Sequence, residues 1–243
     1  MSDPLTGLSS MATRHALADL CRVYEASGAG RVRFESVGGV DAARRVRAGE
    51  AIDLVVLAAD AIDALANTGH VVADSRSEII ASSVAIAVPL DAPRPDVSSE
   101  EALRRTLLAA RRIGYSTGPS GTALLRLFAR WGIAETLQER LVQAPPGKPV
   151  AALLAGDEAD LGFQQQSELQ GEPGIAVLGP MPPGVEIVTT FVGAVGARSQ
   201  RIDAARAVLE FLQLPANDEV KRRHGMAPAR QAAALHPTPS AST

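Results

Sequence analysis

Four short loops of small residues stand directly before segments that the sequence predicts to be helical. The loops are 8–13, 36–39, 117–121 and 145–148. The first backbone N–H groups of a helix have no partner within it, and the helix dipole adds partial positive charge there. Such an end can bind an anion. Each loop alone could equally be an ordinary helix cap with a tight turn, but four loops together favour a shared anion site.

Recognisable catalytic motifs are absent from the sequence. It contains no glycine-rich dinucleotide motif after a strand, no Walker lysine loop, no G-x-S-x-G elbow and no H-E-x-x-H pair. The histidines are scattered singly, at His15, His70, His224 and His236, and Cys21 is the only cysteine. We therefore expect no metal, no cofactor and no intrachain disulfide. His15 differs from the other histidines because it lies beside the first loop, and an unperturbed pKa near ~6.5 suits proton transfer.

The elements that must position these loops follow a regular alternation. Apolar runs predict strands at 53–58, 83–88, 112–116, 160–164, 175–178 and 186–197. Amphipathic spacing predicts helices at 12–27, 40–48, 60–66, 100–110, 149–155 and 202–214, and one after the third loop with Leu124, Phe128 and Trp131 on one face. This alternation predicts an α/β fold with mixed, mostly parallel sheets flanked by helices. The tail, 228–243, is expected to be mobile.

Composition limits the partners and the location of the chain. It has 243 residues, of which 46% are hydrophobic and 3% aromatic, with a net charge of −3. The small net charge and the few aromatic residues argue against nucleic acid as a partner. The longest apolar run, 79–90, is shorter than the ~20 residues needed to span a bilayer, so no membrane span is expected. The first thirty residues contain no apolar signal-peptide core. The sequence as written therefore predicts a cytoplasmic protein, or a periplasmic one if a leader was removed.

The order of several motifs resembles the molybdate-binding, type II periplasmic solute-binding family. The motifs are 9–13, 35–41, 48–56, 114–121, 131–137, 156–163 and 205–212. Their order and spacing carry the resemblance, which covers nearly the whole chain short of the tail. The resemblance implies two α/β lobes joined by two crossover strands, with a small anionic ligand held in a cleft between them. The first lobe would be 1–82 with 191–243, and the second 83–190.

The resemblance also implies which loops contact the ligand. The expected ligand-binding residues are Ser9, Ser10, Ser36, Gly38 and Gly39 in the first lobe and Thr117, Ser120, Lys148 and Gln165 in the second. These positions lie in the helix-opening loops that the electrostatic argument selects, or directly after a predicted strand. If the protein is exported, an ABC permease would be its partner.

The sequence departs from the family in ways that affect the choice of ligand. Molybdate binders of this family hold the oxyanion largely with neutral hydroxyls and backbone N–H groups. Here Arg14 follows the first loop, Lys148 stands in the fourth, and Gln164 and Gln165 lie where the family usually has a tyrosine. Fixed cations and amides suit carboxylates, because a guanidinium can pair with a carboxylate through two hydrogen bonds. The ordinary alternatives are that both cations are solvated surface charges and that the glutamines face solvent.

Two functions stay open on the sequence alone. The first is a clamp that binds a polycarboxylate or a molybdate-type oxyanion, as substrate-binding components of ABC transporters do. The alternative is a cofactor-free isomerase or tautomerase of a polycarboxylic acid, for which the fold class has an enzymatic relative in aconitate isomerase. His15, Glu35 or Glu168 could then exchange the proton, and His15 is favoured by its ordinary pKa. The absence of an evident acid–base pair favours the first function.

Overall fold

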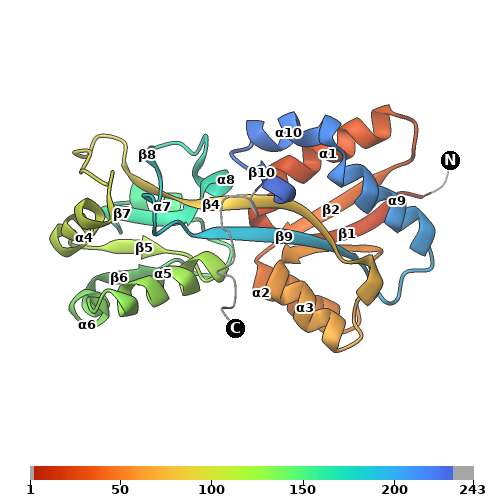
Figure 1. The fold of residues 1–243 in the computed structure, drawn as a ribbon, viewed down its shortest axis with the longest axis horizontal. Helices are drawn as coiled ribbons and strands as arrows, with labels where there is room; N and C mark the ends of the chain where they lie inside the picture. The colour runs from red at the N-terminus through yellow and green to blue at the C-terminus, as the bar shows by residue number, and fades with distance from the viewer. Residues whose placement is uncertain (1–2, 232–243) are drawn as a thin grey trace, which may run out of the picture. The chain divides into compact units, whose positions relative to one another are not determined.

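The computed structural model describes residues 3–231, which divide into two compact units (Figure 1). Unit 1 is Met1–Ala81 with Thr190–Thr243, and unit 2 is Ser82–Thr189. Both boundaries fall at or within strands, β4 (Ser77–Pro89) and β9 (Val188–Val195). The chain therefore leaves unit 1 and returns to it in extended conformation.

The sheet of unit 1 is centred on parallel strands. Strand β1 (Leu5–Ser10) pairs in parallel with β2 (Val32–Val37) and β3 (Leu54–Ala58). β9 adds to β3 in the antiparallel direction, and β10 (Ala227–Pro228) pairs with the first part of β4. Parallel strands end at the same edge of a sheet, so the last residues of β1 and β2 lie side by side.

Helices cover both faces of the unit 1 sheet (Figure 1). The elements are η1 (Met11–Thr13), α1 (Arg14–Ala26), α2 (Gly39–Arg47), α3 (Ala59–Asn67), η2 (Ala73–Ser75), α9 (Ile202–Gln213), η4 (Pro215–Asn217) and α10 (Asp218–Arg223). Side chains alternate between the faces of a strand. Leu54 of β3 accordingly packs with α1 and α9, whereas Val55 packs with α2 and α3.

Unit 2 has a sheet of the same kind. β5 (Ile113–Tyr115) lies between β6 (Leu141–Gln143) and β7 (Leu161–Gln165) and is parallel to both, and β4 pairs antiparallel with β7 and β8 (Ile175–Pro180). The helical elements are α4 (Glu100–Ala109), α5 (Pro119–Arg130), α6 (Ala134–Leu137), η3 (Gln138–Arg140), α7 (Val150–Ala155) and α8 (Gln166–Leu169). One apolar core lies under α4 to α6 and another under α7. The predicted α/β class, with mixed sheets flanked by helices, is confirmed.

Two expectations about loops are corrected by the fold. Ser9 and Ser10 end β1, and Ser36 lies near the end of β2, so these residues belong to strands that the sequence did not predict. Glycine is required at position 7 of β1, because the ring of Phe34 leaves no room for a side chain there: a Cβ on Gly7 would lie 2.4 Å from that ring. Short strands with so few β-branched residues give a weak local signal.

The first residues of the tail that was predicted to be mobile are packed against the sheet of unit 1. Pro228 pairs in β10 and Ala229 is buried, because strand pairing holds this part of the chain against β4. Residues 232–243, the rest of that predicted tail, lie outside the described residues.

Candidate functional site

The carboxyl edge of the unit 1 sheet brings together the residues expected there. Ser9 pairs with Ser36 in the β1–β2 register, and their hydroxyl oxygens are 2.8 Å apart. A Cβ placed on Gly39 would lie 3.9 Å from the hydroxyl of Ser10, so the start of α2 lies beside the end of β1. Ser9 is fully buried, whereas Ser10, Ser36, Gly38 and Gly39 are partly exposed. These four therefore form the part of the edge that a ligand can reach.

The start of α2 supplies free backbone donors at this edge. Gly38 precedes the helix and no side chain caps it. The first intrahelical bond is donated by Ala42 to the carbonyl of Gly38, so the N–H groups of the first turn before Ala42 have no partner within the helix. Val40 in this turn is 67% exposed, which shows that the turn is open to solvent. Open N–H groups with two nearby hydroxyls suit an anion.

The first helix presents a free cation near the same edge. Arg14 is the first residue of α1, directly after the short helical turn that follows Ser10, and its side chain is exposed. Within residues 3–231 its guanidinium forms no hydrogen bond or ion pair. An exposed guanidinium without a partner among these residues can pair with a carboxylate.

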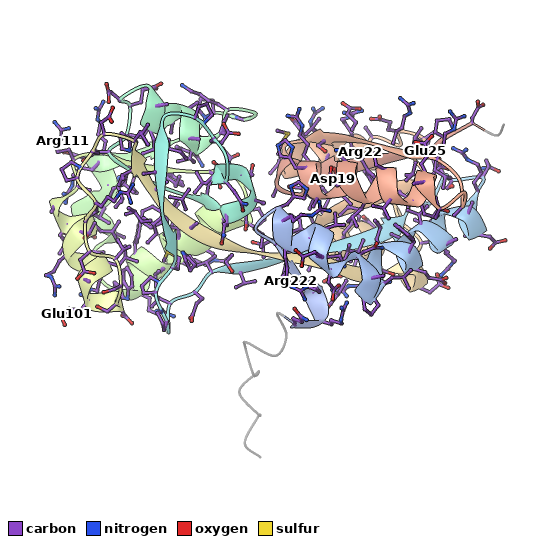
Figure 2. All side chains as sticks on the ribbon, turned by 90° about the horizontal axis from the view of Figure 1, so that it is seen from above. Asp19, Arg22, Glu25, Glu101, Arg111 and Arg222 are labelled. Atoms are coloured by element: carbon purple, nitrogen blue, oxygen red, sulfur yellow. The ribbon has the colours of Figure 1, made fainter. Side chains whose placement is uncertain are left out.

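Two of the three residues proposed for proton exchange are engaged elsewhere. The ring of His15 stacks on that of His224, with centroids 6.3 Å apart, and His224 is 2.9 Å from the carboxylate of Asp19 (Figure 2 labels Asp19 on α1). His15 is thus part of the contact between α1 and α10. Glu35 receives two hydrogen bonds from Arg45, of 2.6 and 2.7 Å, which lower the pKa of its carboxyl group. A carboxylate held in this way is a poor base.

In unit 2, the third loop folds tightly over the start of α5. The hydroxyl oxygens of Ser116 and Ser120 are 2.9 Å apart, and Ser120 is buried while Thr117 is exposed. The loop requires glycine at one place, since a Cβ on Gly121 would lie 1.9 Å from the carbonyl oxygen of Ser116. Gly118 precedes the helix without a side-chain cap, so this helix start also carries free N–H groups.

The two expected glutamines are buried at the end of β7, which excludes the alternative that they face solvent. The Gln164 oxygen accepts a 2.7 Å bond from the backbone N–H of Val150, and the Gln165 amide donates a 2.7 Å bond to the Thr189 hydroxyl. Among the described residues the Gln165 Oε1 is buried and has no partner. A hydroxyl can donate or accept, so a reversed amide would still bond Thr189 and leave the NH₂ group unpaired instead. Either orientation leaves one polar atom of Gln165 without a partner among the described residues.

Lys148 is not the free cation that the sequence suggested. Its ammonium lies 2.7 Å from the carboxylate of Glu158, and both side chains are partly exposed. A ligand at this position must compete with Glu158 for the lysine.

Glu168 is the remaining titratable residue near the end of β7. It lies in α8, is partly exposed, and its carboxyl group is hydrogen bonded by the side chain of Gln164. Burial raises the pKa of Glu168 to about 7, and the bond from Gln164 opposes part of that rise. Within the described chain it has no ion pair.

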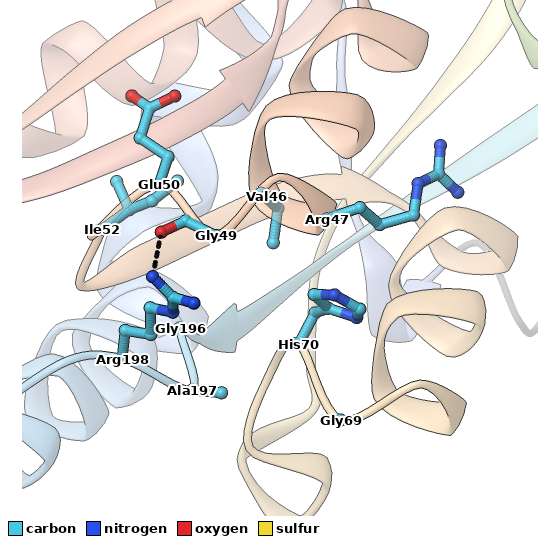
Figure 3. A pocket seen from close by; sticks show the side chains of 10 residues that line it. All are labelled: Val46, Arg47, Gly49, Glu50, Ile52, Gly69, His70, Gly196, Ala197 and Arg198. Atoms are coloured by element: carbon cyan, nitrogen blue, oxygen red, sulfur yellow. Dashed lines mark hydrogen bonds between the residues drawn. The ribbon is translucent and has the colours of Figure 1, made fainter.

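A pocket elsewhere in unit 1 involves none of the expected residues (Figure 3). Its volume is about 210 Å³, and its walls include Arg47, Gly49, His70 and Arg198. Arg198 donates a 2.8 Å bond to the carbonyl of Gly49. Arg47 and Gly49 precede β3, Arg198 follows β9, and the carbonyl of His70 accepts a hydrogen bond from the N–H of Ala197 just after β9. The pocket therefore lies at the amino end of β3, opposite the edge that carries Ser10 and Ser36.

Paired α/β units, each with parallel strands that end in hydroxyl-bearing helix starts, are the architecture of solute-binding proteins. The chain belongs to the bacterial extracellular solute-binding protein family, whose sequence model matches residues 5–227. The predicted resemblance is thereby confirmed. No helix among residues 3–231 is both long and apolar enough to cross a membrane.

Individual relatives fall into two groups. The chain is 35% identical to an aconitate isomerase from a Pseudomonas species over 214 residues, which is 86% of this chain and 81% of that protein. Its fold is similar to that of the periplasmic molybdate-binding protein of Azotobacter vinelandii, with a TM-score of 0.76, 16% identity and coverage of 92% and 98% of the two chains. The sulfate-binding protein SubI of Mycobacterium tuberculosis also has a TM-score of 0.76, at 19% identity, over 98% of this chain and 93% of that one. At such identities the solved structures show a common fold only.

Proposed function

We propose that this chain binds a small polycarboxylate and moves a carbon–carbon double bond within it, as an isomerase that needs no cofactor. The observation that carries the proposal is the 35% identity to an aconitate isomerase across 86% of the chain. The oxyanion-binding neighbours are similar at 16–19% identity, which supports the fold and leaves the ligand open.

The proposed ligand contacts combine neutral donors with one free cation. In unit 1 they are Ser10, Ser36, Gly38, Gly39 and Arg14, with Ser9 behind them; in unit 2 they are Thr117, Ser120, Gln164, Gln165 and Lys148. The guanidinium of Arg14, unpaired within residues 3–231, supports a carboxylate ligand, because such a pair can form two charge-assisted hydrogen bonds. The unpaired atom of Gln165 supports a ligand with a polar group directed at the end of β7.

The reaction would be an allylic proton shift. A base removes a proton from the methylene carbon next to the double bond, the electron pairs shift along the three carbons, and the proton returns at the far carbon. Carboxylates attached to the carbon frame accept the transient negative charge as an enolate. Helix-start N–H groups and Arg14 would stabilise that charge. The product has the same atoms and the same oxidation state as the substrate, so the reaction requires no redox cofactor.

The test is proton NMR of cis- and trans-aconitate incubated with the purified protein, combined with calorimetric titration of tricarboxylates, molybdate and sulfate. We expect interconversion of the two isomers and binding of tricarboxylates in preference to the oxyanions. Tight molybdate binding, with no response to tricarboxylates and no isomerisation, would instead favour a binding protein for oxyanions. For such a protein the proposed partner is an ABC permease and the proposed location is outside the inner membrane.

A further inference from the structure

Glu168 is a carboxyl group in an unusual setting. It is only partly exposed, within residues 3–231 it has no ion pair, and the neutral amide of Gln164 hydrogen bonds its carboxyl group. Partial burial without a cation disfavours the charged form of a carboxyl group, because the water that it loses is not replaced by a positive charge. Two features distinguish Glu168 from other partly buried carboxyl groups. It lies just after the carboxyl end of β7, and its partner is the side chain of Gln164.

Its position places it at the edge where ligands bind in α/β sheets. The strands β5, β6 and β7 are parallel, so their carboxyl ends lie at one edge of unit 2. Helix α8 begins directly after β7, and Ser116 and Ser120 follow the carboxyl end of β5. In open α/β sheets, ligands bind outside the carboxyl ends of the strands. Glu168 therefore belongs to the same edge as the expected ligand-binding residues of unit 2.

Gln164, the hydrogen-bond partner of this carboxyl group, is itself held in place by the backbone. The amide oxygen of Gln164 accepts the N–H of Val150 at 2.7 Å, so its NH₂ group is the part that donates to Glu168. An amide bonded at both ends cannot rotate without losing one bond. With a single neutral donor, the carboxylate keeps free lone pairs, and one of these could accept a proton from a ligand.

The protonation behaviour of Glu168 suits proton transfer near neutral pH. A general base is most effective when its pKa lies close to the working pH, and burial raises the pKa of Glu168 to about 7. The competing residues are less suitable, because Glu35 is held by Arg45 and His15 stacks against His224.

We propose that Glu168 is the catalytic acid–base residue of the double-bond shift and that Gln164 positions it. The inference rests on the proposed function. The Glu168 carboxylate takes a proton from the methylene carbon of the bound polycarboxylate, and the C–H electron pair forms the new double bond. The former π pair becomes an enolate at the far carbon, which then takes the proton back from the Glu168 carboxylic acid. One proton leaves and one returns, so the carboxylate is regenerated and nothing is oxidised or reduced.

The experiment compares wild type with Glu168→Gln, and uses Glu172→Gln as the matched control. Glu172 lies in the turn after α8, is partly exposed and is not among the expected ligand contacts. Isomerisation of trans-aconitate, and exchange of its methylene protons in D₂O, are followed by NMR, and the dissociation constant by calorimetry.

We expect Glu168→Gln to lose about a hundredfold or more in both rates while its dissociation constant changes less than about threefold, because general acid–base catalysis contributes ~10²–10⁴-fold. Glu172→Gln should behave as wild type. The wild-type kcat should rise with pH through about 7, as the carboxyl group loses its proton.

The outcomes separate the two proposals. A wild-type protein that neither isomerises nor exchanges protons overturns the proposed function, and the role of Glu168 with it. An active wild type with a Glu168→Gln variant within fivefold of its rate overturns the role of Glu168 alone. If Glu168→Gln does not fold, Glu168→Asp decides: it retains a carboxylate that is set back by one methylene, so kcat should fall at least tenfold with an unchanged dissociation constant. A Glu168→Asp variant with the same kcat as wild type would overturn the acid–base role of Glu168.

Discussion

Arg14 and Lys148 are the two cations that the sequence places beside candidate anion loops, and their surroundings differ. Arg14 has no partner among residues 3–231, whereas Lys148 lies 2.7 Å from the carboxylate of Glu158. If the proposed ligand binds at both residues, it gains the full interaction with Arg14 but must displace Glu158 before it can pair with Lys148. The exposed Lys148–Glu158 pair itself adds little to stability.

We therefore predict unequal effects of removing the two cations. Arg14→Ala should weaken tricarboxylate binding by about ten- to a hundredfold, since one charge-assisted hydrogen bond is worth ~1.5–3 kcal/mol. Lys148→Ala should weaken it by less than about threefold. Calorimetric titration measures both, with Arg130→Ala, an exposed arginine at the end of α5, as the control for loss of a positive charge. Equal losses in the Arg14 and Arg130 variants would contradict a direct contact with Arg14.

The Glu168 carboxyl group also leads to a prediction about the free energy of unfolding, which does not depend on catalysis. Its pKa is about 7 in the folded protein against the ordinary 4.5, so between these pH values the folded state binds more protons than the unfolded state. The contribution of this group to stability therefore falls as pH rises through that window. Glu168→Gln should be more stable than wild type by roughly 2–3 kcal/mol at pH 8 and by almost nothing at pH 4. Urea unfolding at the two pH values tests this, and a difference independent of pH would exclude the titration.

At the scale of elements, the start of α5 matters because its backbone lies very close to the residues that precede the helix. Gly121, in the first turn of α5, packs directly against the carbonyl of Ser116, so the loop can close only over a residue without a side chain. A Cβ on Gly118 in the same loop would meet only the hydroxyl of Ser116, at 3.9 Å, which is ordinary van der Waals contact. The two glycines thus provide a matched pair.

We predict that Gly121→Ala opens the loop while Gly118→Ala leaves it intact. The first should destabilise unit 2 by about 1–3 kcal/mol, as overpacking does, and should weaken ligand binding because Ser116 and Ser120 separate. The second should change stability by less than about 0.5 kcal/mol. Denaturant unfolding and ligand titration of both variants provide the measurement. Similar behaviour of the two would show that the close contact at Gly121 does not hold the loop.

At the scale of the whole molecule, Asp53 connects parts of unit 1 that are far apart in the chain. Its carboxylate accepts bonds from the N–H of Thr6 at 2.9 Å, the Ser199 hydroxyl at 2.7 Å and the Arg201 guanidinium at 2.5 Å. Burial alone would raise the pKa of Asp53, but these bonds outweigh it and the pKa is lowered. Residues 199 and 201 follow the return of the chain from unit 2, so this carboxylate holds the returning segment against β1.

Asp53→Asn should therefore destabilise the protein in a pH-dependent way. The stabilisation from a carboxylate with a lowered pKa is present above its ordinary value of 3.8 and is lost as pH falls through the folded value. We expect a loss of about 3 kcal/mol at pH 7, because a buried, hydrogen-bonded charge is removed, and a smaller loss at pH 3. The control is Asp203→Asn, an exposed carboxylate in the first turn of α9, which should cost less than about 1 kcal/mol. A loss of equal size at both pH values would contradict the ion-pair argument.

Much of the fold could be predicted from sequence because the relevant signals are local. The apolar run at Leu54–Ala58 and the helical spacing of Leu124 and Phe128 are properties of neighbouring residues, and both elements are present. The helix starts beside Ser10, Gly39 and Ser120 were also identified from residue types, and the order of motifs indicated the family. Hydrophobic periodicity requires no knowledge of distant contacts.

The properties of the candidate site depended on contacts that only the tertiary structure defines. The bond between Ser9 and Ser36 joins residues 27 positions apart, and Lys148 meets Glu158 across a helix. The residue types favoured His15 as the base, but the raised pKa of Glu168 comes from burial, which outweighs the opposing hydrogen bond from Gln164. The pKa of a carboxyl group depends on whether water surrounds it. Packing of the whole unit decides which carboxyl groups lose that water.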